Sequence, residues 1–152
     1  MSRYLAVLFA LLLLLGFAFS EDFYKGYCSS CHMPDARGIP GLYPPLRPMA
    51  MYLCLSEGRA YLIRTTLFGL VGPIRVQGIE YRGTRVMPAF GDWLDDEGIA
   101  LILNDLLRVI EAKVPAFRMQ EVRTYRTPRL TPNEVYRLRE ELLSKHPKPP
   151  CS

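Results

Sequence analysis

Histidine and cysteine are both scarce in this sequence of 152 residues. It has two histidines, His32 and His146, and four cysteines. A structural zinc site needs four such ligands, usually arranged as two close pairs. Cys54, Cys151 and His146 each stand alone in the sequence, so nothing completes a second pair. This scarcity argues against a structural zinc protein and leaves one close cysteine pair to explain.

The sequence also lacks internal repeats and an excess of one charge sign, since it has 19 basic and 15 acidic side chains. The charges are unevenly placed. Residues 21–111 carry 9 basic and 11 acidic side chains, a net charge of −2, whereas residues 112–152 carry 9 and 4, a net charge of +5. The basic pI of about 9.0 is therefore a property of the C-terminal part. We expect no nucleic-acid partner.

The remaining cysteine pair is followed directly by a histidine, in the order Cys28-Ser29-Ser30-Cys31-His32. A C-x-x-C-H run is the attachment signature of a c-type haem, in which two thiols form thioethers with the haem vinyl groups. The motif therefore predicts covalently bound haem c, held by Cys28 and Cys31 with His32 as a ligand of the iron. The alternatives are a dithiol redox motif, which requires a thioredoxin-like βαβ context, and half of a zinc site.

The first 20 residues have the form of a secretory signal peptide. A weakly basic start is followed by an apolar run over residues 4–19 and by a small-x-small pattern at Ala18-Phe19-Ser20. The alternative is an uncleaved anchor, but the run is shorter than the ~20 residues of a spanning helix. We expect a periplasmic or exported protein, attached to a membrane only if this segment is retained.

The hydrophobic pattern of the rest predicts helices joined by long loops. Helices are expected at 22–31, at 59–69 with a glycine stop, at 95–109, and at about 132–144 after a capping box. Residues 72–83 favour a hairpin or a tight loop. Residues 33–48 contain five prolines and cannot be regular. We expect this segment to wrap the proximal side of the haem, with Pro44-Pro45-Leu46 near His32.

A second axial ligand is sought among the methionines that follow the signal peptide. Methionine opposite histidine is the electron-transfer choice in cytochromes c. Met87 stands apart because it lies in a loop bounded by glycine and proline, directly before the helix at 95–109. Any single methionine is more often core filler than a ligand. The other four are Met33, Met49, Met51 and Met119.

These features together resemble a known family. The matching motifs, in order, are Cys28-Ser29-Ser30-Cys31-His32, Pro44-Pro45-Leu46, Gly72-Pro73-Ile74, Tyr81-Arg82-Gly83, Met87-Pro88-Ala89-Phe90 and Asp95-Asp96-Glu97. They are similar to the mono-haem class I cytochromes c, especially the periplasmic ones that partner dehydrogenases such as sulfite dehydrogenase. The resemblance covers residues 22–109. It implies the all-α class I cytochrome c fold, a small helical haem domain with long loops and here a C-terminal helical extension.

The resemblance also implies site residues. Met87 becomes the distal ligand of the iron. Candidates to bond or cover the haem propionates are Arg64, Arg75, Tyr81 and Trp93. A bis-histidine site using His146 is the alternative to methionine ligation.

The implied function is one-electron transfer by an exported cytochrome, which requires no catalytic residue. Its partners would be redox proteins, with a dehydrogenase as donor and an oxidase or another cytochrome as acceptor. The alternatives are a dedicated haem subunit of a periplasmic dehydrogenase complex, a haem sensor or enzyme with an open distal site, and a thiol oxidoreductase. We divide the chain into a signal peptide (1–20), a haem domain (21–112) and a basic extension (113–152).

The extension leaves two questions open. Cys54 and Cys151 either form a disulfide that staples it to the haem domain, or remain a buried small residue and a free thiol. The extension itself either packs on its own haem domain or docks on an acidic partner.

Overall fold

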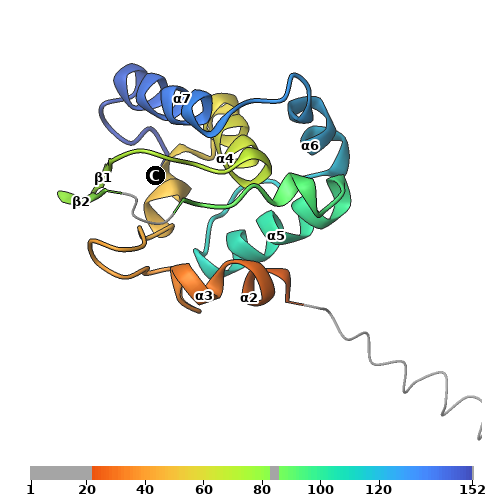
Figure 1. Cartoon of the computed structure of the whole chain (residues 1–152), viewed down its shortest axis with the longest axis horizontal. Coiled ribbons are helices and arrows are strands. Elements are labelled where there is room, and N and C mark those ends of the chain that lie inside the picture. Colours follow the sequence, from red (N-terminus) through yellow and green to blue (C-terminus); the bar gives the residue numbers. More distant parts are fainter. Residues whose placement is uncertain (1–21, 83–85, 152) are drawn as a thin grey trace, which may run out of the picture.

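The computed structural model describes residues 22–82 and 86–151, which form a mainly helical protein (Figure 1). The predicted signal peptide lies outside the described residues. The helices surround a single hydrophobic core, to which residues from most of them contribute. In chain order the elements are α2 (Phe23–Tyr27), α3 (Ser29–His32), the 3-10 helix η1 (Arg47–Tyr52), α4 (Ser56–Phe68), β1 (Ile74–Val76), β2 (Ile79–Tyr81), the 3-10 helix η2 (Phe90–Asp92), α5 (Asp96–Val109), α6 (Met119–Arg126) and α7 (Pro132–Lys145).

Helix α5 is the centre of the core. Its apolar residues repeat at helical spacing, and Ile99, Ile102 and Leu103 are almost completely buried. The Asp95 side chain caps its start by accepting a hydrogen bond from the Gly98 N–H at 2.8 Å. Helices α2, α4 and α6 pack against it. The helix predicted at 95–109 is confirmed.

The N-terminal helix differs from the prediction, because the expected helix at 22–31 is two short helices that meet at Cys28. Cys28 stays in the right-handed helical region with ψ −36°, but its φ of −115° is far from the usual helical value. A partly buried contact fixes the first piece, since the Asp105 carboxylate of α5 accepts a hydrogen bond from the Phe23 N–H at 2.6 Å. This tertiary contact is invisible to a periodicity argument.

A small antiparallel hairpin makes all-α only an approximate description. Strand β1 pairs with β2 in the register Ile74 to Tyr81, Arg75 to Glu80 and Val76 to Ile79. Between the strands, Gln77 and Gly78 both have positive φ, as a tight turn requires. The hairpin alternative for residues 72–83 is therefore correct.

The C-terminal extension packs on the rest of the chain. Helix α7 lies along α4, and α6 contacts both α4 and α5 (Figure 1). The Thr131 and Glu134 capping box starts α7 as predicted. Helix α6 was not predicted, because it has only eight residues and Val122 is its only buried one. Cys54 and Cys151 form a disulfide, so the staple is present.

None of the helices within residues 22–82 and 86–151 is both long and apolar enough to cross a membrane.

Candidate functional site

A mostly apolar cavity of about 490 Å³ opens between α3, α4, the hairpin and α7. These elements surround the left half of the molecule in Figure 1. This volume is within the usual range for small-molecule and cofactor sites. All four predicted site residues, Cys28, Cys31, His32 and Met87, lie in its wall. Other parts of the wall are apolar, among them Tyr27, Leu42, Leu46, Leu62, Ile74 and Phe90.

The two thiols of the motif come from the junction of α2 and α3. Cys28 is buried and Cys31 is partly exposed, and neither is in a disulfide. Burial raises the pKa of Cys28 to about 12, and Cys31 contributes a smaller effect in the same direction. A reactive dithiol requires a lowered thiol pKa. The arrangement therefore argues against the thiol-oxidoreductase alternative.

His32 is held as a neutral imidazole. Its Nδ1 lies 2.8 Å from the Pro44 carbonyl oxygen, and because a carbonyl only accepts, Nδ1 donates its proton there. The lone pair is then on Nε2, which is free to bind a metal. Burial lowers the pKa of His32, against a smaller raising effect of the bond to Pro44. A backbone carbonyl that orients a ligating histidine in this way is common at metal centres.

The proline-rich segment 33–48 is ordered by its own backbone. The Gly38 N–H donates to the His32 carbonyl at 2.9 Å, and the Leu46 N–H donates to the Ala36 carbonyl at 2.9 Å. Gly38 has φ +65°, and a Cβ there would lie 2.2 Å from the Tyr43 carbonyl oxygen. The segment therefore folds back on α3 and carries the Pro44 carbonyl to His32, as the proline pattern predicts.

Met87 is placed by a two-residue bridge to the end of α4. Its N–H donates to the Leu70 carbonyl at 3.1 Å, and the Leu70 N–H donates back at 3.2 Å. Gly69 precedes the bridge with φ +78°, and a Cβ there would lie 2.4 Å from the Met87 carbonyl oxygen. The chain can approach α4 this closely only because residue 69 has no side chain.

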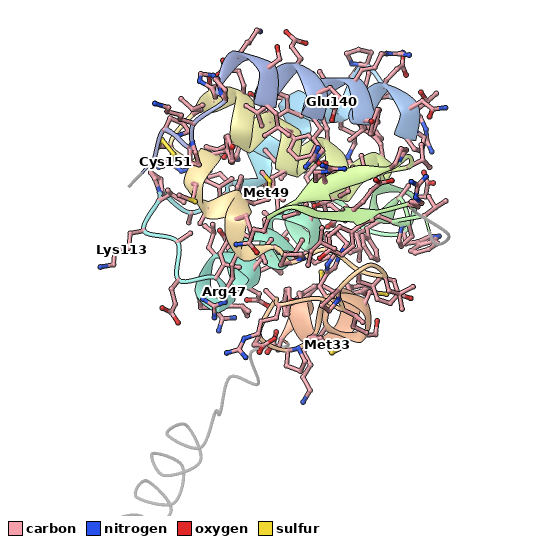
Figure 2. The ribbon with its side chains drawn as sticks, turned by 90° about the vertical axis from the view of Figure 1, so that its left-hand side faces the viewer. Met33, Arg47, Met49, Lys113, Glu140 and Cys151 are labelled. Carbon is pink, nitrogen blue, oxygen red and sulfur yellow. A yellow bond between two sulfur atoms is a disulfide. The ribbon has the colours of Figure 1, made fainter. Side chains whose placement is uncertain are left out.

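Three methionines line the cavity, namely Met49, Met51 and Met87. Met33 and Met119 are not among the lining residues. Figure 2 shows Met33 at the edge of the molecule beside α3, where its carbonyl accepts the Tyr24 hydroxyl at 2.7 Å. The structure therefore narrows the thioether candidates to three.

The other predicted candidates divide into two groups. Arg75 and Tyr81 line the cavity, whereas Arg64, Trp93 and His146 do not. The Arg64 guanidinium lies over the ring of Tyr125, 4.9 Å from its centroid. Trp93 is 69% exposed and touches only Phe90 edge-on among the aromatic rings described. The His146 Nε2 faces Glu57 at 3.6 Å.

Sequence reasoning missed several polar residues of the wall, among them Tyr61, Thr65 and Arg139. Tyr61 and Thr65 are on α4, and Arg139 is on α7 of the extension. A signal for Arg139 was present, since it lies four residues after Val135 and three before Leu142, on the apolar face of its helix.

The cavity fits the haem that the motif predicts. Two free thiols and an unprotonated imidazole nitrogen belong to one wall of an apolar space of suitable volume, with thioethers elsewhere in the wall. Among the described residues, no group of three or more His, Cys, Asp or Glu side chains forms a metal site that would compete with this interpretation. A helical fold around such a cavity is the arrangement expected of a c-type cytochrome.

Two known proteins are similar in sequence to this chain, and both are cytochromes c. A cytochrome c-552 of Thermus thermophilus is 40% identical over 144 residues, which is 89% of this chain and 95% of that relative. A second Thermus thermophilus cytochrome c-552 is 40% identical over 121 residues, covering 76% of this chain and 90% of the relative. No protein-family model matches the chain.

The chain belongs to the cytochrome c-552 family of c-type cytochromes. Its cofactor is therefore covalently bound haem c, and its general role is to carry electrons between redox partners. This confirms the predicted class and cofactor. The finer resemblance to cytochromes that partner dehydrogenases stays a prediction.

Proposed function

We propose that the protein is an exported one-electron carrier whose haem is attached through Cys28 and Cys31 and ligated by His32 and Met87. The observation that supports this proposal is that Met87 lines the same apolar cavity as the Cys28, Cys31 and His32 motif, although it lies more than fifty residues further along the chain. The bound haem supplies an iron centre that cycles between the ferrous and ferric states.

The residues of the chain tune that centre. The Pro44 carbonyl fixes the His32 ring and its tautomer, so the Nε2 lone pair is presented without reorganisation. A methionine thioether as the second ligand favours ferrous iron and raises the reduction potential. The apolar wall excludes water, which acts in the same direction. If His32 and Met87 both held the iron, no open coordination position would remain for a substrate.

Redox partners would meet the protein over the mouth of the cavity. Four apolar lining residues, Tyr27, Leu42, Met51 and Val86, are also well exposed to solvent. An exposed apolar rim of this kind suits a small transient interface with another redox protein. The partners that we propose are a dehydrogenase as donor and an oxidase or another cytochrome as acceptor.

Export and the division of the chain belong to the same proposal. The signal-peptide pattern over residues 1–20 supports export, and the Cys54–Cys151 disulfide is typical of an oxidising compartment. We place the haem domain at 21–112 and the basic extension at 113–152.

The test is the optical spectrum of the protein produced with haem-c maturation. Ferric haem bound by methionine has a weak far-red band. We expect this band in the parent protein and its loss in Met87→Ala. Met49→Ala is the matched control, because it removes another thioether from the same cavity, and its band should persist.

Two results would overturn the proposal. A band that survives in Met87→Ala would move the ligand to Met49 if it disappears in Met49→Ala, and to Met51 if it survives in both variants. A haem spectrum with no far-red band in the parent would favour a bis-histidine or open distal site.

A further inference from the structure

Arg139 is a buried cation in the wall of the cavity. Arg139 is only 9% exposed to solvent, although it belongs to helix α7 of the extension. Its guanidinium donates to the Arg75 carbonyl at 2.8 Å and to the Glu140 carboxylate at 3.1 Å. The Glu140 side chain is 53% exposed, and pairs with exposed charges contribute little. A buried cation is costly unless it has a strong partner, so the pairing seen here is incomplete.

Two hydroxyl residues of α4 line the same cavity. Thr65 is buried, and its Oγ1 has no partner at hydrogen-bond geometry among the described residues. Tyr61 is also buried, and burial raises the pKa of its hydroxyl. The charge of Arg139 and weaker hydrogen bonding by the Thr65 and Arg139 side chains lower that pKa, so the three groups lie close together in the wall. Unsatisfied polar groups in a native interior call for a missing partner. A cation and two hydroxyls in one apolar cavity suit an anion that accepts hydrogen bonds.

The position of these groups matches the shape of a haem. Helices α3 and α7 lie at opposite ends of the molecule in both views (Figures 1 and 2). In a haem, the two thioether positions are on one edge of the macrocycle and the two propionate carboxylates are on the opposite edge. Attachment at α3 therefore directs the carboxylates away from α3, toward α4, the hairpin and α7.

We propose that Arg139, with Tyr61 and Thr65, binds a haem propionate, so the C-terminal extension supplies the counter-charge of the cofactor. This inference rests on the proposed function, because it requires haem attached at Cys28 and Cys31. A cation fixed beside the haem favours the ferrous state, which carries one positive charge fewer. The extension would then help to set the reduction potential in addition to stabilising the fold.

The test compares two arginines of the same helix. Arg139→Gln removes the buried cation, whereas Arg137→Gln removes a neighbouring one whose side chain is 72% exposed. The midpoint potential of each haem-loaded variant is measured at mildly alkaline pH, where carboxylates are ionised. We expect a lower potential for Arg139→Gln, an unchanged one for Arg137→Gln, and partial recovery for Arg139→Lys, which keeps the charge but loses the planar fork.

Thr65→Val gives a second test that does not disturb a charge. If the Thr65 hydroxyl bonds a propionate, the variant should also have a shifted potential. If it bonds nothing, valine should fit the buried site at least as well and leave the potential unchanged.

The results separate this inference from the proposed function. Equal potentials for Arg139→Gln and Arg137→Gln, together with an unchanged potential for Thr65→Val, would overturn it and leave Arg139 as a tie between α7 and β1. Failure of the parent to attach haem would instead overturn the proposed function, and it would be visible in the spectrum before any potential is measured.

Discussion

At the scale of single residues, one glycine decides where Met87 can lie. Gly69 ends α4 with φ +78°, a region that side-chain-bearing residues rarely adopt. The Met87 carbonyl oxygen occupies the space that a Cβ would need, at 2.4 Å. Two independent constraints therefore act on this position, a backbone angle and a close approach.

A pair of glycine variants separates these two constraints. Gly78 has φ +81° but no atom within 4 Å of its would-be Cβ. We expect Gly78→Ala to lower the free energy of unfolding by roughly 1 kcal/mol through backbone strain alone. Gly69→Ala should cost more and should also weaken the far-red band, because the Met87 segment must move. Denaturant unfolding and the optical spectrum measure both effects, and equal behaviour of the two variants would contradict this account.

At the scale of elements, an acidic residue ties α6 to the start of α5. The Asp96 carboxylate accepts hydrogen bonds from Arg126 at 2.6 Å and from Arg123 at 3.0 Å. Burial acts to raise the pKa of Asp96, but the bonds and charges of the two arginines outweigh it and hold the pKa below its ordinary value. This contact explains how α6 is held although Val122 is its only buried residue.

The lowered pKa of Asp96 makes this tie dependent on pH. A carboxylate with a depressed pKa in the folded state stabilises the protein above its unfolded-state pKa and loses that contribution as pH falls through the folded-state pKa. We expect Asp96→Asn to lower the free energy of unfolding by about 2 kcal/mol at neutral pH. The difference between parent and variant should shrink in acid. A difference that stays constant from neutral pH to strong acid would contradict the ionic origin.

At the scale of the whole molecule, arginines of the basic extension pair with carboxylates of the acidic front of the same chain. These pairs include Arg126 with Asp96 at 2.6 Å and Arg129 with Asp92 at 2.7 Å. Arg59 of the front pairs in the opposite sense, with Glu121 of the extension at 2.7 Å. The extension therefore packs on its own haem domain, which was one of the two alternatives left open by the sequence.

The disulfide closes this arrangement at the end of the chain. Cys54 and Cys151 are 97 residues apart in sequence, and a cross-link over so long a loop strongly restricts the unfolded chain. We expect the double variant Cys54→Ser, Cys151→Ser to lose about 4 kcal/mol of unfolding free energy. Denaturant unfolding of the haem-loaded protein measures the loss. An unchanged midpoint would show that α7 and the ion pairs hold the extension without the staple.

The reduction potentials of the parent and of the double cysteine variant give a further check on the role of Arg139. Because Cys151 lies beyond α7, opening the disulfide should leave Arg139 in place while α7 stays folded. The potential should then change less than in Arg139→Gln.

The sequence by itself determined the local chemistry of this protein. The Cys28 to His32 motif, the capped helices and the proline-rich loop depend on neighbours a few residues apart, so spacing and propensity were sufficient to predict them. The class and its haem cofactor followed from that motif, and the relatives confirm both.

Tertiary structure decided what depends on distant contacts. Four features depend on contacts between segments that are far apart in the chain. They are the break at Cys28, helix α6, the Cys54–Cys151 pairing and the place of Arg139 in the cavity wall. No local pattern encodes which distant partner a side chain meets, because that choice is made by packing of the whole core. The buried arginine on the apolar face of α7 was visible in the sequence, but only the folded chain shows the cavity wall that it helps to form.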